Sequence, residues 1–187
     1  MSSYSLPDPT GPRDSTLARM LHQRKHRALL LYLLLLTCWP WLHDRKRPLE
    51  GDVWIRALTA KGAPTWSAST LSRSWADLAE LGLVTKGAKR EGRLIRPAPR
   101  REDAAADYEF PGGRRDRFNT YFALPDEFWK DELFAKALLP ALVMLLVIAK
   151  ETNSKEEVWF TYDGLEDWYG IKRKSPERRG GARRALA

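Results

Sequence analysis

Hydroxyl-bearing and basic side chains, spaced to share one face of a helix, form the part of this sequence best suited to contact a polyanion. Residues 67–81 place Leu71, Trp75 and Leu78 on one apolar face at 100° per residue. The opposite face is small and polar, and hydroxyl and guanidinium groups there can hydrogen-bond phosphates or base edges. The acidic residues, Asp77 among them, lie toward the C-terminal end and would repel phosphate. We therefore predict contacts from Ser69, Thr70, Ser72 and Arg73.

Two dense clusters of basic residues lie outside this predicted helix. The formal net charge of the 187-residue chain is +8, which favours an acidic partner such as nucleic acid or an acidic membrane face. Each cluster holds seven Lys and Arg against one Glu, and two separate clusters indicate two contact surfaces, although charge runs are commonly solvated faces. The predicted contacts are Lys86, Lys89, Arg90, Arg93 and Arg96 in the first cluster, and Lys172, Lys174, Arg179, Arg183 and Arg184 in the second.

Residues that could carry catalysis or hold a metal are scarce. The sequence has no Gly-rich phosphate loop, no zinc-ribbon spacing and no recognisable Ser-His-Asp arrangement. His22 and His26 share a helix face, but one helix would place Cys38 about 18 Å from His26 at 1.5 Å per residue, too far for one zinc site. Both histidines instead belong to a basic face that could touch phosphate. We expect no enzyme, no metal, no cofactor and no small-molecule substrate.

The first half of the chain is predicted to hold three helices and a hairpin. Residues 1–15 are expected to lack fixed structure, and a helix follows over 16–37 until Pro40 forces an exit. Asp52 is expected to cap a short helix over 53–60. Ser67 or Ser69 caps helix 67–81, Gly82 ends it, and strands 83–86 and 93–96 flank a charged tip, before a long excursion over 97–117.

The second half is predicted to repeat this order. A strand over 118–124 precedes a helix that Asp126 caps, and an apolar helix runs over 136–152. After a short strand or connector over 159–161, a helix over 162–169 is stopped by Gly170, and Ser175-Pro176 begins the last helix. The sequence of elements, rather than any repeat of residues, indicates two similar units.

Two apolar runs decide between a packed core and a membrane protein. Residues 28–42 and 137–149 are shorter than the roughly 17–25 apolar residues of a spanning helix, and Pro40 interrupts the first. The favoured interpretation is two core helices that are apolar nearly all round. The alternative is a small membrane protein with hydrophobic helices over 29–42 and 137–149.

The eight tryptophans are interpreted mainly as packing residues. Trp54, Trp75, Trp129 and Trp168 occupy amphipathic positions, which favours burial over contact with a ligand. Trp66 precedes helix 67–81 and could reach a ligand, although packing is the favoured interpretation. A single cysteine, Cys38, excludes an intrachain disulfide and favours the cytoplasm.

The first half of the chain resembles winged helix-turn-helix proteins. The run ADLAELGLVTK (Ala76–Lys86), followed by a basic hairpin with Leu94-Ile95, is similar to the junction between recognition helix and wing in that family. The resemblance covers residues 20–124. It implies that the helix over 67–81 enters the major groove and that the tip of the wing, here the first basic cluster, contacts phosphate or the minor groove.

The second half extends this resemblance. The runs TYFALPDEFW (Thr120–Trp129), EDWYGIKRKS (Glu166–Ser175) and RRAL resemble tandem winged-helix proteins of actinobacterial plasmids, phages and integrative elements. Those proteins are replication-initiator-like or regulatory. The resemblance implies that a second recognition helix begins after WYGI. The pattern of the family continues beyond Ala187 to a second wing, so the second unit is expected to be incomplete.

The sequence thus predicts a mainly α fold with a small β-wing. A disordered tail (1–15) precedes a winged-helix DNA-binding domain (16–124), and a second winged-helix-like helical unit, incomplete at its C-terminus, spans 125–187. The predicted function is double-stranded DNA binding as a replication-initiator-like or transcription-regulatory protein in the cytoplasm, with a homodimer left open. The alternatives are the membrane protein above and a winged-helix module that binds other proteins.

Overall fold

Helices make up most of the described chain. The structure is a computed structural model, and it describes residues 15–45, 47–61, 63–85, 97–100, 124–152 and 158–171, with the backbone of two short strands. The eight helices of these ranges are α1 (Thr16–His22), α2 (His26–His43), α3 (Gly51–Leu58), α4 (Ala68–Glu80), α5 (Glu127–Lys130), α6 (Leu133–Lys136), α7 (Leu139–Thr152) and α8 (Tyr162–Tyr169). The strands are β1 (Arg90–Glu91) and β2 (Leu94–Ile95). The predicted mainly α fold is confirmed for this part of the chain.

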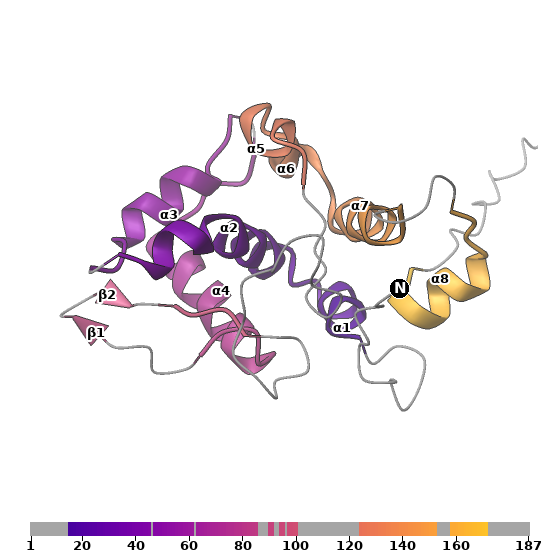
Figure 1. The fold of residues 1–187 in the computed structure, drawn as a ribbon, viewed down its shortest axis with the longest axis horizontal. Helices are drawn as coiled ribbons and strands as arrows, with labels where there is room; N and C mark the ends of the chain where they lie inside the picture. Colours follow the sequence, from indigo (N-terminus) through magenta and orange to yellow (C-terminus); the bar gives the residue numbers. More distant parts are fainter. Residues whose placement is uncertain are drawn as a thin grey trace, which may run out of the picture.

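Helix α2 is the central element of the arrangement (Figure 1). It packs against α4, which in turn packs against α3. Helix α1 continues toward the other end of the molecule, where it contacts α7 and α8. The apolar character of α2 follows from this position, because a helix with neighbours on several sides buries most of its surface, as Leu31 and Leu35 do completely. One continuous core joins residues of α2, α4 and α7.

The first predicted helix is broken in two, so the prediction of one helix over 16–37 is wrong. Helix α1 ends at His22, and Arg24 adopts a left-handed backbone conformation with φ 56°. The amide N–H of Arg24 donates to the carbonyl of Leu21, and that of Lys25 to the carbonyl of Met20. This hydrogen-bond pattern closes a helix end and turns the chain before α2 begins.

Pro40 lies inside α2, which runs to His43, so the predicted exit at Pro40 is wrong. Proline removes one hydrogen bond to the carbonyl four residues earlier and usually bends or ends a helix. Here the flanking side chains of Trp39 and Leu42 are both buried. Their burial offsets the lost hydrogen bond, and the helix continues for one more turn.

The predicted caps in the first half were right for one helix and wrong for the other. Ser67 caps α4, and its hydroxyl accepts from the amide N–H of Thr70 at 3.2 Å. Asp52 does not cap α3, because that helix already begins at Gly51 after the N-cap residue Glu50. Asp52 lies instead in the first turn, where its negative charge is favourable near the positive end of the helix dipole.

The apolar stripe of α4 packs as predicted. Leu78 is fully buried and Leu71 nearly so. Trp75 is half-buried and meets Trp54 of α3 edge to face, with ring centroids 5.3 Å apart. The buried hydroxyl of Ser74 donates to the carbonyl of Thr70 at 2.9 Å, so this polar group costs little to bury. Helix α4 therefore has one face committed to the core.

A short antiparallel pair of strands follows α4. Gly82 has φ 76°, which confirms the predicted left-handed glycine at the end of α4. The chain then pairs Val84 with Pro99. Farther out, β1 and β2 pair Arg90 with Ile95 and Glu91 with Leu94, so Arg90 and Glu91 lie in a strand rather than in the predicted tip.

The structure revises the start of the second half. Asp126 does not cap α5 through its side chain; its carboxylate instead contacts Lys130 at 2.6 Å. The expected helix is interrupted at Glu132, which has φ 55°, and resumes as α6. The apolar helix α7 begins at Leu139 rather than at residue 136. Pro140 then lies in the first turn, where its missing N–H costs no helical hydrogen bond.

Helix α8 follows the prediction closely. Thr161 caps it, and Gly170, with φ 68°, ends it. Residues 158–161 form a connector without strand pairing. The predicted strand over 118–124 and the last helix from Ser175 onward fall outside the described residues, apart from Leu124, which is in no strand.

The tryptophan predictions hold except at Trp168. Trp54 is buried, and Trp75 and Trp129 are half-buried against the core. Trp168 is 51% exposed, whereas Leu165, three residues earlier in α8, is buried. Among the described helices, none combines the length and the apolar character needed to cross a bilayer.

The left-handed turn at Gly82 carries a prediction for stability. Replacing Gly82 by Ala places a Cβ at positive φ and should lower the free energy of unfolding by about 1 kcal/mol. Gly51→Ala is the matched control, because Gly51 begins α3 and an added Cβ there would meet Leu71 only at an ordinary 3.6 Å. Urea unfolding of the two variants measures both effects. Equal stabilities for the two variants would contradict the conformational role assigned to Gly82.

Candidate nucleic-acid interface

The solvent-facing side of α4 holds the candidate contacts. Ser69, Ser72 and Arg73 are exposed, as are the small residues Ala68 and Ala76. The exposed face lies opposite the buried stripe of Leu71 and Leu78, because side chains seven residues apart share one side of a helix. Small side chains allow a close approach to a partner, and the hydroxyl and guanidinium groups can hydrogen-bond it.

Thr70 differs from the other three predicted contacts on α4, Ser69, Ser72 and Arg73. Its side chain is half-buried, and its hydroxyl lies 2.9 Å from that of Ser67 and 3.3 Å from a guanidinium nitrogen of Arg27. Thr70 thus supports the start of α4 and links it to α2. Its predicted role as a direct contact stays a prediction, but its hydroxyl is already engaged within the fold.

Arg27 is the residue that sequence reasoning did not place beside α4. Its guanidinium also approaches the carbonyl of Thr65 at 3.4 Å and lies over the ring of Trp66, 5.8 Å from the centroid. Trp66 itself is buried, so packing is confirmed as its role. Arg27 therefore places a positive charge at the N-terminal end of α4. The basic run RKHR was visible in the sequence, but its position next to α4 depends on contacts between residues 38 to 43 positions apart in the chain.

Lys25 pairs with Asp77, one of the two acidic residues of α4. Its ammonium nitrogen lies 2.6 Å from a carboxylate oxygen of Asp77, and both side chains are largely buried. The sequence analysis treated Asp77 as a charge that would repel phosphate. The ion pair compensates the charge of Asp77, whereas the exposed Glu80 still disfavours an anionic partner at the C-terminal end of α4.

The base of the hairpin, where residues 83–85 pair with residues 98–100, is attached to α2. The amide N–H of Arg100 donates to the carbonyl of Leu83 at 2.8 Å, and that of Thr85 to the carbonyl of Ala98 at 3.0 Å. The hydroxyl of Tyr32 on α2 donates to the carbonyl of Arg100 at 3.0 Å. Helix α2 therefore contacts both α4 and the base of the hairpin.

The remaining predicted contacts lie in β1 or outside the described residues. Arg90 belongs to β1, of which only the backbone is described. The other basic candidates fall outside the described residues: Lys86, Lys89, Arg93, Arg96, Lys172, Lys174, Arg179, Arg183 and Arg184.

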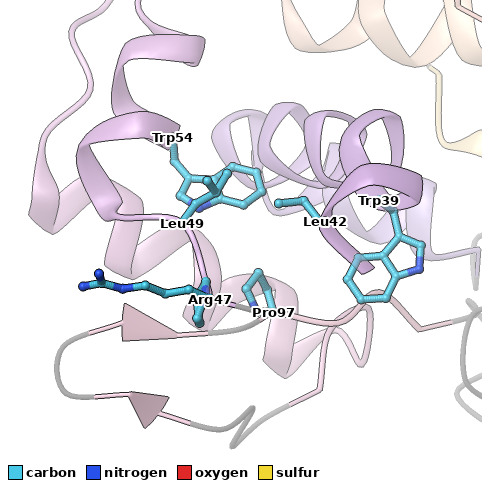
Figure 2. A pocket seen from close by; sticks show the side chains of 7 residues that line it. Trp39, Leu42, Arg47, Leu49, Trp54 and Pro97 are labelled. Carbon is cyan, nitrogen blue, oxygen red and sulfur yellow. The ribbon is translucent and has the colours of Figure 1, made fainter. Parts of the chain in front are cut away.

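A cavity between the end of α2, α3 and the hairpin is too small for a ligand (Figure 2). Its volume is about 10 Å³, which is room for one water molecule at most. Its lining includes Trp39, Leu42, Trp54 and Pro97. Within the described ranges, no group of three or more His, Cys, Asp or Glu side chains is arranged to hold a metal ion.

Two side chains on α2 have shifted pKa values. Burial, with a smaller contribution from the charge of Arg27, lowers the pKa of His26. The Nε2 atom of His26 is buried and has no hydrogen-bond partner among the described residues. Burial raises the pKa of the Cys38 thiol, which disfavours the reactive thiolate form.

Comparison of the chain with protein-family models, with curated proteins and with solved structures finds no match.

The ion pair between Lys25 and Asp77 can be tested by a double-mutant cycle. Because both side chains are largely shielded from water, we expect Lys25→Met and Asp77→Ala to be coupled by about 1 kcal/mol in the free energy of unfolding. The pair of Lys130 and Asp126 is the control, since both its side chains are more than two-thirds exposed and its coupling should be much smaller. Equal coupling energies in the two cycles would contradict the role of the first pair.

The environment of His26 predicts a dependence of stability on pH. Its pKa is lowered on folding, so the unfolded chain binds a proton first as the pH falls. The free energy of unfolding should therefore keep its full contribution from His26 above pH 6.5, about the pKa of histidine in the unfolded chain, and decrease below that pH. His26→Gln removes this titration, and urea unfolding on both sides of that pH should show a weaker dependence in the variant. An unchanged dependence would show that His26 is not responsible.

Proposed function

We propose that this protein binds double-stranded DNA through the exposed face of α4 and the hairpin that follows it, in the manner of a winged helix-turn-helix protein. The observation that carries the proposal is the exposed group of Ser69, Ser72 and Arg73 on a helix whose other face is buried. At 13 residues α4 is about 20 Å long, and the major groove, about 12 Å wide, admits a helix.

The charge distribution around α4 supports this proposal. Arg27 lies at its N-terminal end, Lys25 compensates Asp77, and Arg73 projects from its exposed face. The overall charge of +8 favours encounter with a polyanion. In this proposal α4 reads base edges, the basic residues of the hairpin bind phosphates, and the protein acts in replication initiation or transcription regulation.

Salt dependence tests the phosphate contacts. The logarithm of the association constant for a mixed-sequence duplex should fall by about 0.9 per phosphate contact for each tenfold rise in salt. The double variant Lys89→Ala, Arg90→Ala should weaken binding to all duplexes alike and reduce this slope. Fluorescence anisotropy at several salt concentrations measures the slope. Affinity that does not change between low and physiological salt would refute the proposal.

Sequence selection tests the role of α4. Arg73→Ala should relax the base preference at one position of a duplex selected from random DNA, because arginine commonly recognises guanine by two hydrogen bonds. Lys136→Gln is the control for a lost charge, since α6 lies well away from α4 (Figure 1). A selected sequence that is identical for the wild type and Arg73→Ala would contradict base reading by this residue.

A protein-interaction module is the second candidate, and exposed aromatic side chains favour it. Trp159 is 91% exposed, Tyr162 62% and Trp168 51%, and such side chains are enriched where proteins bind one another. This candidate predicts weak duplex binding that Arg73→Ala does not change. It also predicts that Trp159→Ala removes an interaction with a protein partner while duplex affinity is unaffected.

A further inference from the structure

Arg24 occupies a backbone position that disfavours every residue with a Cβ except, at lower cost, asparagine and aspartate. Its φ of 56° lies in the left-handed region, where the Cβ approaches the following carbonyl. The hydrogen bonds from Arg24 to Leu21 and from Lys25 to Met20 are those of a helix that ends with a left-handed residue. Glycine is the usual residue at this point.

The same chain uses left-handed glycines to end two other helices. Gly82 ends α4 with φ 76°, and its neighbour Leu83 donates to the carbonyl of Leu78 at 2.9 Å. Gly170 ends α8 with φ 68°, and Ile171 donates to the carbonyl of Leu165 at 3.2 Å. An arginine at the third such position therefore carries a conformational cost that glycine would avoid.

Within the described residues, nothing that Arg24 contacts compensates this cost. The residue is exposed, and no hydrogen bond, ion pair or aromatic contact engages its guanidinium there. A positive charge is favourable near the C-terminal end of a helix, but Arg19 and His22 already lie in the last turn of α1. A strained residue that the fold does not need is a candidate for function.

The location of Arg24 indicates what that function is. The next residue, Lys25, contacts Asp77 of α4, and Arg27 contacts Thr70 of the same helix. Asp77 and Thr70 are seven residues apart and so share one edge of α4, beside the exposed Arg73. The turn that carries Arg24 therefore lies along the flank of the proposed DNA-facing helix.

We infer that Arg24 binds a phosphate of the DNA backbone beside α4, an inference that rests on the proposed function. A guanidinium can donate two parallel hydrogen bonds to one phosphate and stays charged at all physiological pH values. The left-handed turn leaves Arg24 exposed just before Lys25 and Arg27, the two residues that contact α4. Phosphate contacts position a protein on the duplex, so Arg24 would help to fix the depth and register of α4 in the groove.

The test sets stability against binding in the full chain. Arg24→Gly should raise the melting temperature by about 2–4 °C, because glycine relieves the left-handed strain. The same variant should bind a mixed-sequence duplex of more than two helical turns more weakly, with a salt slope reduced by about 0.9. Arg24→Gln should show the same reduction of the salt slope without the gain in stability. Arg24→Lys should keep most of the wild-type salt slope.

Two reference variants separate the possible outcomes. Lys136→Gln should leave melting and duplex binding unchanged, and Arg73→Ala reports on the proposed function independently. If Arg73→Ala relaxes the selected DNA sequence but Arg24→Gly and Arg24→Gln bind as the wild type does, the inference about Arg24 is wrong and the proposed function stands. If Arg73→Ala leaves the selected sequence unchanged and the Arg24 variants leave duplex affinity and its salt slope unchanged, both are wrong. A lower melting temperature for Arg24→Gly would also overturn the inference, since the arginine would then serve the fold.

Discussion

The packing of α4 on α2 and α3 is the constraint on which the candidate interface depends. Leu71 and Leu78 are buried, and Trp75 meets Trp54 edge to face, so one side of α4 is fixed against the core. Burying such side chains contributes roughly 1.5–3 kcal/mol each. Because the apolar face is held inward, Ser72 and Arg73 must point to solvent. The burial of the apolar face of α4 therefore determines which polar side chains its outer face presents to a partner.

Helix α2 then determines what surrounds that outer face. Its N-terminal end brings Lys25 and Arg27 to one edge of α4, and Tyr32 fixes the base of the hairpin through the carbonyl of Arg100. A helix that organises two neighbours in this way is buried along much of its length. This explains its nearly continuous run of leucines, which in the sequence alone also fits a membrane segment.

Local signals in the sequence were sufficient for some elements. The structure confirms three such signals: the helical periodicity of the apolar residues in α4, the capping hydroxyl of Ser67, and the glycines that end α4 and α8. Each of these signals acts within one or two turns of helix. Elements that depend on distant contacts were not predictable in this way. The burial of Trp39 and Leu42 lets α2 continue past Pro40, and the position of Arg27 beside Thr70 arises only when α2 and α4 pack.

The backbone at Arg24 is the clearest case in which local rules gave the wrong answer. Arginine is a good helix former, so the sequence indicated an unbroken helix. The structure turns the chain there, which lets α1 reach α7 and α8 while α2 packs on α4. Trp168 was misassigned for a related reason, since which side of α8 is buried depends on how that helix meets α1.

The most direct test of the central claim is a map of backbone amide chemical shifts during titration with a DNA duplex. The account predicts that the largest changes lie on the exposed face of α4, around Ser69, Ser72 and Arg73, with changes also at the turn before α2. Shifts confined to α8 and its preceding connector, with α4 unaffected, would contradict it.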